Sequence, residues 1–207
     1  MFKLHASQSR TTALPRATVL FAAALFSIPI LPSAPAHAER FEFDPRRTEV
    51  RFAYSMGFQT GRGRFTKVGG TIELDDALPQ NTIVAASIAT DSLTTGEPLV
   101  DAELKGASFF NVASSPVIAF KSRTVLPHGE GAADVAGDIT VNGITRPVML
   151  KVTLQPHDDP ALKHDAGARA FLAKTRIQRS QFNMTGYQSM VGDDVDIEIS
   201  AIVRPRK

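Results

Sequence analysis

The side chains best suited to acid–base or metal chemistry are concentrated in one polar segment late in the chain. His157, Asp158 and Asp159 are followed a few residues later by His164 and Asp165. Imidazole and carboxylate groups bind zinc, but a zinc site needs a closed ligand pattern that this spacing does not supply. We therefore interpret the segment as a solvated loop and expect no metal site.

Other catalytic patterns are equally weak. No serine stands in a nucleophile-elbow pattern, which leaves a lipid hydrolase as a distant alternative. The run Gly61 to Arg64 opens a strand-like stretch and not a helix, so it does not match a phosphate-binding loop. The sequence contains no cysteine, which excludes thiol chemistry and disulfides. We expect no catalytic residues, no cofactor and no enzyme activity.

The most distinctive apolar feature is the adjacent pair Phe109 and Phe110, which lies in a connection. A phenylalanine ring buries roughly 150–250 Å² when packed, so two such rings are costly to leave in water. In an all-β chain, the surface that accepts them is expected to be the open mouth or the flank of a barrel. Ordinary core packing is an equally weighted alternative.

The elements around this pair are predicted to be strands, because apolar and polar residues alternate with a period of two. Asn142-Gly143 between β-rich arms predicts a tight hairpin, and helical content is expected only around residues 96–105. Gly57, Gly61 and Gly63 are expected to punctuate a turn or bulge. About eight strands with short connections indicate an up-and-down antiparallel barrel, with a sandwich as the alternative.

The first 38 residues are predicted to be a signal peptide. They combine a basic start without acidic residues, an apolar run and the small-x-small sequence Ala36-His37-Ala38. Cleavage near Ala38/Glu39 would leave residues 39–207 as one domain, periplasmic or secreted; a retained anchor is the alternative. The remaining 20 Lys and Arg against 21 Asp and Glu give a net charge of −1, which offers no reason to expect nucleic acid as a partner.

Four blocks in register resemble the YceI-like family, whose members form a lipocalin-like antiparallel barrel around a long apolar cavity. The matching blocks are Asp101 to Phe120, Gly137 to Val148, Ile177 to Met184 and Val191 to Val195. One departure is Met56-Gly57-Phe58, where family members often carry His-Leu-Gly. This departure bears on the identity of the ligand more than on the fold.

The resemblance implies a carrier for a polyisoprenoid, a prenyl quinone or a similar long amphiphile. A barrel of about eight strands is just wide enough for one slim ligand. Arg179 is the predicted contact for a phosphate or polar head group, and a structural salt bridge or a role on the strand face is the alternative. The predicted cavity wall comprises Phe52, Tyr54, Met56, Phe65, Leu104, Phe109, Phe110, Phe120 and Phe182.

The alternative function is a structural or interaction module, in which the barrel is filled by its own side chains and the glycine- and arginine-rich Gly61–Gly70 stretch meets a partner. A transient membrane contact and a homodimer through exposed edge strands are compatible with either interpretation. An apolar cavity would favour the carrier, whereas large side chains meeting across the whole interior would favour the module.

Overall fold

The computed structural model describes residues 38–129, 131–156, 162, 163, 165 and 167–206. Nearly all of the predicted signal peptide lies outside these residues, as do His157, Asp158, Asp159 and His164. Within the described part, no helix is long and apolar enough to cross a membrane. The same part contains no cluster of three or more His, Asp or Glu side chains that could hold a metal ion.

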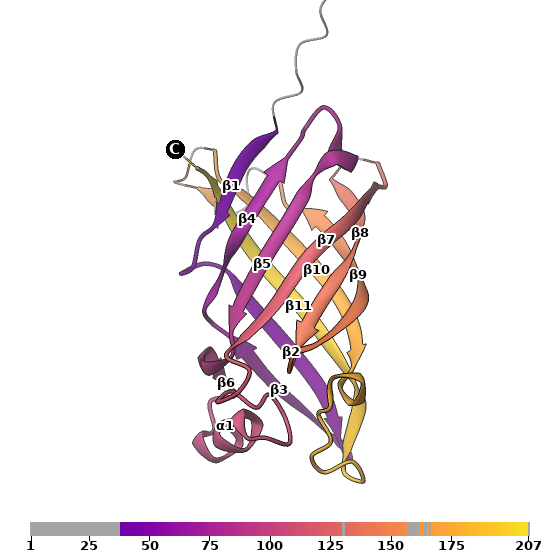
Figure 1. Ribbon diagram of the computed structural model, residues 1–207. Coiled ribbons are helices and arrows are strands. Elements are labelled where there is room, and N and C mark those ends of the chain that lie inside the picture. Colours follow the sequence, from indigo (N-terminus) through magenta and orange to yellow (C-terminus); the bar gives the residue numbers. More distant parts are fainter. Residues whose placement is uncertain (1–37, 130, 157–161, 164, 166, 207) are drawn as a thin grey trace, which may run out of the picture. The chain divides into compact units, whose positions relative to one another are not determined.

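Antiparallel strands make up most of the described chain, with a single α-helix, α1 (Pro98–Lys105) (Figure 1). Short 3₁₀ turns are formed by η1 (Pro79–Asn81), η2 (Thr90–Ser92) and η4 (Arg179–Phe182). The strands are β1 (Glu39–Phe43), β2 (Glu49–Met56), β3 (Gln59–Phe65), β4 (Val68–Leu74), β5 (Ile83–Ala89), β6 (Leu93–Thr94), β7 (Val117–Pro127), β8 (Ala132–Val141), β9 (Ile144–Leu154), β10 (Arg169–Gln178) and β11 (Val191–Pro205).

The sheet closes into an eight-stranded barrel, which confirms the predicted fold class. Its ring runs in the order β1-β4-β5-β7-β8-β9-β10-β11, and β1 also pairs with β11 to complete it. Full closure removes the exposed sheet edges of this ring. Strands that follow one another in the ring are antiparallel neighbours, as expected for an up-and-down meander.

Three of the long barrel strands are interrupted rather than continuous. Because β2 continues β1 along β11, while β3 and β6 continue β4 and β5, the short strands extend the barrel at one end. The predicted helix lies beyond β6 at this same end (Figure 1). The barrel is thus built up at one end by additional strands and a helix.

The glycines of β3 have a role different from the predicted turn or bulge. Gly57 lies in the β2–β3 turn with φ +57°, but Gly61 and Gly63 lie inside β3, opposite Tyr54 and Phe52. A Cβ on Gly63 would collide with the Phe52 ring, and one on Gly61 would collide with the Tyr54 ring. These two glycines therefore make room for aromatic rings inside the barrel and do not form a bulge.

The predicted Asn-Gly hairpin joins β8 to β9. Asn142 and Gly143 have φ values of +51° and +73°, the signs that a type I′ turn requires at both central residues. The Asn142 amide also donates hydrogen bonds to the carbonyl oxygens of Phe109 (2.7 Å) and Phe182 (3.0 Å). The hairpin thereby anchors two other connections at the same end of the barrel.

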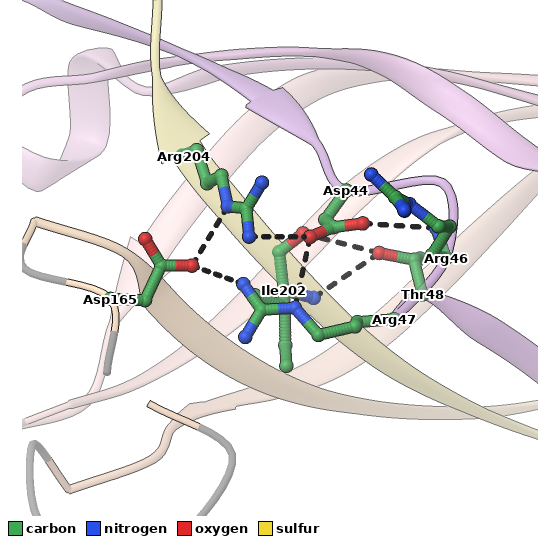
Figure 2. Close-up of polar contacts among 7 residues, drawn as sticks. All are labelled: Asp44, Arg46, Arg47, Thr48, Asp165, Ile202 and Arg204. Atoms are coloured by element: carbon green, nitrogen blue, oxygen red, sulfur yellow. Dashed lines mark hydrogen bonds and ion pairs between the residues drawn. The ribbon is translucent and has the colours of Figure 1, made fainter. Parts of the chain in front are cut away.

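An ion-pair network holds the break between β1 and β2 at the opposite end (Figure 2). Asp44 is 6% exposed and accepts hydrogen bonds from the Arg46 main-chain N–H and the Arg47 side chain, both at 2.9 Å. Arg204 of β11 lies 3.2 Å from Asp44 and 2.7 Å from Asp165, which also pairs with Arg47. The network fastens the β9–β10 connection to the outside of the barrel.

Candidate ligand-binding cavity

A cavity of about 400 Å³ lies inside the barrel. This volume is within the range of roughly 300–1,000 Å³ that is typical of small-molecule sites. Every strand of the closed ring contributes to the wall, and among the residues that the structure describes the charged lining side chains are Asp75, Asp76, Arg169 and Arg179. The representative wall residues, one from each ring strand in chain order, are Phe43, Leu74, Val84, Phe120, Val135, Leu150, Ala173 and Ile199.

One end of the cavity is closed by packed apolar side chains, which we call the floor. It comprises the rings of Phe52, Phe65, Phe109 and Phe110 together with Leu104. The Phe110 ring centroid lies 5.2 Å from that of Phe65 and 5.9 Å from that of Phe52. Leu104 of α1 and Phe109 are 6% and 5% exposed. These centroid distances are typical of favourable aromatic pairs. The helix and the segment after it therefore act as a plug.

The other end, which we call the mouth, is where the cavity meets solvent. Among the described lining residues, those classed as exposed all lie in the connections β4–β5 and β7–β8 or at their borders. Both connections are at the end opposite α1 (Figure 1). The exposed lining residues are Asp76, Pro79, Pro127, Gly129 and Gly131.

A two-bond ion pair crosses this mouth. Arg169 donates from Nη1 and Nη2 to the two carboxylate oxygens of Asp76, at 2.7 and 2.6 Å. The hydrogen bond raises the pKa of Arg169 and lowers the pKa of Asp76, so both groups are charged at neutral pH. The Arg169 guanidinium also lies over the Phe41 ring, 5.1 Å from its centroid. Arginine is thereby held at the rim of an otherwise apolar wall.

Comparison with known proteins identifies the family. Residues 41–203 match the model of the YceI-like domain, a span that covers nearly the whole barrel. The chain belongs to the YceI-like family. Protein YceI of Salmonella arizonae is 33% identical over 146 residues, which cover 70% of this chain and 74% of that protein. Protein YceI of Salmonella paratyphi B matches equally well.

Solved structures agree on the YceI-like fold. BcnA of Burkholderia cenocepacia superposes with a TM-score of 0.69 at 22% identity, covering 77% of this chain and 98% of BcnA. A polyisoprenoid-binding domain from Saccharophagus degradans superposes with a TM-score of 0.60 at 13% identity, covering 80% and 98%. At these identities the likeness concerns the fold alone.

Most of the residues predicted to form the wall are brought together by the YceI-like barrel. Those that line the cavity are Phe52, Tyr54, Phe65, Leu104, Phe109, Phe110 and Phe120. Burial raises the pKa of Tyr54, which keeps its hydroxyl protonated at neutral pH. Whether any of these side chains touches a ligand stays a prediction. The phenylalanine pair, expected at an open mouth or flank, instead closes the floor.

Two of the predicted wall residues lie outside the cavity lining. Met56 is 40% exposed at the end of β2, so the position where the family often has histidine does not face the cavity here. Phe182 is 1% exposed and belongs to the packed core around the floor. Its backbone carbonyl accepts one of the Asn142 bonds described above.

Arg179 lies beside the floor and away from the mouth, because it directly follows the last residue of β10, whereas Arg169 is the first. It is 4% exposed, and its guanidinium donates to the main-chain oxygens of Met184, Gly186, Val191 and Gly192 at 2.7–2.9 Å. It also lies over the Phe109 ring, 5.8 Å from the centroid. This geometry matches the structural alternative for Arg179, while its head-group role stays a prediction without support.

The mouth residues Asp75, Asp76 and Arg169 were missed by the sequence analysis. A signal for Arg169 was available, because it is in phase with Phe171, Ala173 and the later inward positions of β10. Period-two alternation therefore places Arg169 on the inner face of its strand. Asp75 and Asp76 lie in a turn, where periodicity carries no such information.

Proposed function

We propose that this YceI-like protein binds a polyisoprenoid, a prenyl quinone or a similar long amphiphile inside its barrel and carries it through the periplasm. The observation that carries this proposal is the cavity, whose wall is apolar along almost its whole length. Burial of apolar surface stabilises a complex by roughly 25 cal/mol per Å², so a long hydrocarbon chain gains affinity simply through its length.

The dimensions of the cavity suit a slim chain. Lining residues of β11 extend from Val191 to Ala201, and those of β10 from Arg169 to Ile177, with Arg179 of η4 just beyond the strand. At roughly 3.3 Å per residue along a strand tilted by roughly 40°, ten residues span on the order of 25 Å of the barrel axis. A narrow pocket of this length with one closed end fits a single extended tail that enters from the mouth.

The name of one structural neighbour points to the same ligand class. The Saccharophagus degradans domain with this fold is described as polyisoprenoid-binding. The predicted signal peptide supports a periplasmic setting for the proposed carrier. The alternative of a filled interaction module is disfavoured, because the barrel encloses about 400 Å³ of space that its own side chains do not fill.

Native mass spectrometry of the protein, purified after export of the full chain, tests the proposal directly. We expect an added mass that organic extraction identifies as an isoprenoid or another long-chain lipid. A bare protein that also fails to take up added prenyl quinone would overturn the proposal.

A variant that fills the cavity separates specific binding from adhesion of lipid to the surface. Ala173 lines the middle of the cavity on β10, so Ala173→Trp places a large ring in the path of the tail. The neighbouring Lys174 faces outward and pairs with Glu198 at 3.2 Å, which makes Lys174→Trp a matched control. We expect Ala173→Trp to lose the bound lipid and Lys174→Trp to retain it.

A further inference from the structure

The polar groups at the mouth form a site that an apolar tail does not use. Arg169, Asp76 and Asp75 line the same end of the cavity, where its wall meets solvent. Because a tail that enters from the mouth leaves its head group behind, the head group would lie at the end of the cavity that these three residues help to line. A head-group site at the mouth rests on the proposed function and extends it to the chemistry of the head group.

Arg169 retains donors for a ligand. A guanidinium has five N–H groups, and two of them are used by the carboxylate of Asp76. Among the described residues, the Nε–H and the second N–H of each Nη have no hydrogen-bond acceptor. The contact with the Phe41 ring and the two hydrogen bonds to Asp76 hold the guanidinium in place, so these donors are presented at a defined position.

The charges around Arg169 are predominantly negative. Asp76 pairs with it, Glu39 is close enough to act on it electrostatically, and Asp75, which is 3% exposed, lines the same end of the cavity. One Asp75 carboxylate oxygen accepts hydrogen bonds from the main-chain N–H groups of Ala77 (3.0 Å) and Leu78 (2.8 Å), which fixes that group in place. Among the described residues, an anion beside Arg169 would therefore lie close to the carboxylates of Asp76 and Glu39.

We propose that the Arg169–Asp76 pair is the head-group subsite of this barrel, and that it selects an uncharged hydrogen-bond acceptor over a phosphate. The remaining N–H groups of Arg169 donate to a hydroxyl or carbonyl oxygen, and the ion pair with Asp76 stays intact. A phosphate head would reach the same N–H groups, but its charge would lie beside the Asp76 carboxylate that already holds Arg169.

A pair of ligands that differ only in charge tests this selectivity. A polyprenol and the polyprenyl monophosphate of the same chain length share one tail, and their dissociation constants can be measured by competition against a fluorescent prenyl probe. We expect the polyprenol to bind at least about tenfold more tightly, the effect of one nearby like charge close to a protein surface. Equal or tighter binding of the phosphate would overturn the selectivity.

Two substitutions assign the effect to the subsite. Asp76→Asn retains an oxygen for Arg169 but removes one negative charge, so we expect the preference for polyprenol to fall about tenfold. Arg169→Gln is expected to weaken polyprenol binding about threefold to tenfold through the lost hydrogen bonds. The matched control is Asp196→Asn, because Asp196 forms a similar two-bond pair with Arg176 on the outer face of β10.

The outcomes separate this inference from the proposed function. If Asp76→Asn changes the ligand preference no more than Asp196→Asn does, the subsite is wrong even though lipid still binds. If squalene, which has no head group, binds as tightly as the polyprenol, Arg169 makes no contact and the inference again fails. If none of the three ligands binds, the proposed function itself is overturned.

Discussion

At one end of the barrel, Phe110 packs edge-on against Phe65 with the ring centroids 5.2 Å apart. At the other end, Asp76 forms an ion pair with Arg169, although 66% of the Asp76 side chain is exposed. The floor is sealed by aromatic contacts and by hydrogen bonds to buried carbonyl oxygens. The mouth combines apolar walls with charged groups that reach solvent. The contacts that stabilise the barrel and the opening through which the proposed ligand would exchange thus lie at opposite ends.

This difference shows how a barrel can be both hollow and stable. A cavity removes packing contacts from the middle of the domain, since a wall that faces empty space has no partner atoms. The floor compensates by concentrating the largest buried side chains where β2, β3 and α1 extend the barrel. The mouth then needs no tight packing and can carry polar groups. A substitution at one end of the barrel can therefore be compared with a matched substitution elsewhere that leaves that end intact.

The largest effect is expected at Arg179, which holds the floor from below. Arg179→Met keeps the length of the side chain but leaves four main-chain oxygens, two of them in buried and two in part-buried hydrogen bonds, without this donor. Each unsatisfied group costs roughly 1–3 kcal/mol, so we expect the free energy of unfolding to fall by about 4 kcal/mol or more. Urea denaturation measures the loss.

Arg176→Met provides the control for this prediction. Arg176 lies on β10 just before Arg179 and pairs with Asp196 at 2.7 Å, but its side chain is 60% exposed. Exposed ion pairs contribute roughly 0–1 kcal/mol, so this variant should unfold almost as the unmodified protein does. Equal losses in the two variants would show that Arg179 has no special structural role.

A second comparison uses the same substitution at both ends. Phe109→Ala removes a ring that is 5% exposed and packed on Gly186 and Arg179, so we expect a loss of about 3–5 kcal/mol in unfolding free energy. Phe171→Ala removes a half-buried ring that already borders the cavity, and it should be tolerated better. Urea denaturation of both variants gives the comparison. A larger loss at Phe171 would contradict the division into floor and mouth.

Asn142→Asp tests how the β8–β9 hairpin supports the floor. The substitution keeps the shape and tolerates the positive φ, but it replaces the amide donor with a carboxylate that faces the carbonyl oxygens of Phe109 and Phe182. The Asn142 Oδ1 atom is buried without a partner among the described residues, so no donor is available for the new charge. We expect a loss of about 2–4 kcal/mol at neutral pH. Asn142→Gly, which leaves no charge, should lose less in the same urea assay.

Much of this fold follows from the sequence, because barrel strands alternate with a period that is visible locally. Asn142-Gly143 and the alternation through β9, β10 and β11 are examples, and their neighbours in sequence are also their neighbours in the sheet. Gly61 and Gly63 were misread, because their reason for being glycine lies across the sheet, in the rings of Tyr54 and Phe52. The local sequence pattern does not indicate a contact across the sheet.

The site was predicted less completely than the fold, for a related reason. Composition identifies large apolar residues, but it cannot say which of them face empty space and which pack together, as the different positions of Phe120 and Phe182 show. Arg179 and Arg169 are ten residues apart on the inner face of one strand and its extension. Their surroundings differ because of the connections around them: the η4–β11 connection follows Arg179 directly, whereas the β4–β5 connection that holds Arg169 is 93 residues away in sequence.

The smallest effect is expected from acid titration of the network at the β1–β2 break. Burial alone would raise the pKa of Asp44, but the hydrogen bonds from Arg46 and Arg47 and the charge of Arg204 outweigh it, so the pKa is lowered. The Arg204 and Arg47 side chains likewise lower the pKa of Asp165. A lowered pKa stabilises the fold above the unfolded value of about 3.9, and this stabilisation is lost as the pH falls through the folded value.

Asp44→Asn should therefore make the stability less dependent on pH below about pH 5, with the difference from the unmodified protein greatest at neutral pH. Urea midpoints measured from neutral pH down to about pH 3 provide the test, and Asp91→Asn is the control, since Asp91 forms an exposed pair with Lys67. Parallel pH profiles for the unmodified protein and Asp44→Asn would mean that the network contributes nothing through charge. Because the network lies outside the barrel and does not line the cavity, Asp44→Asn should also leave lipid binding unchanged. By contrast, Asp76→Asn at the same end is expected to alter the ligand preference.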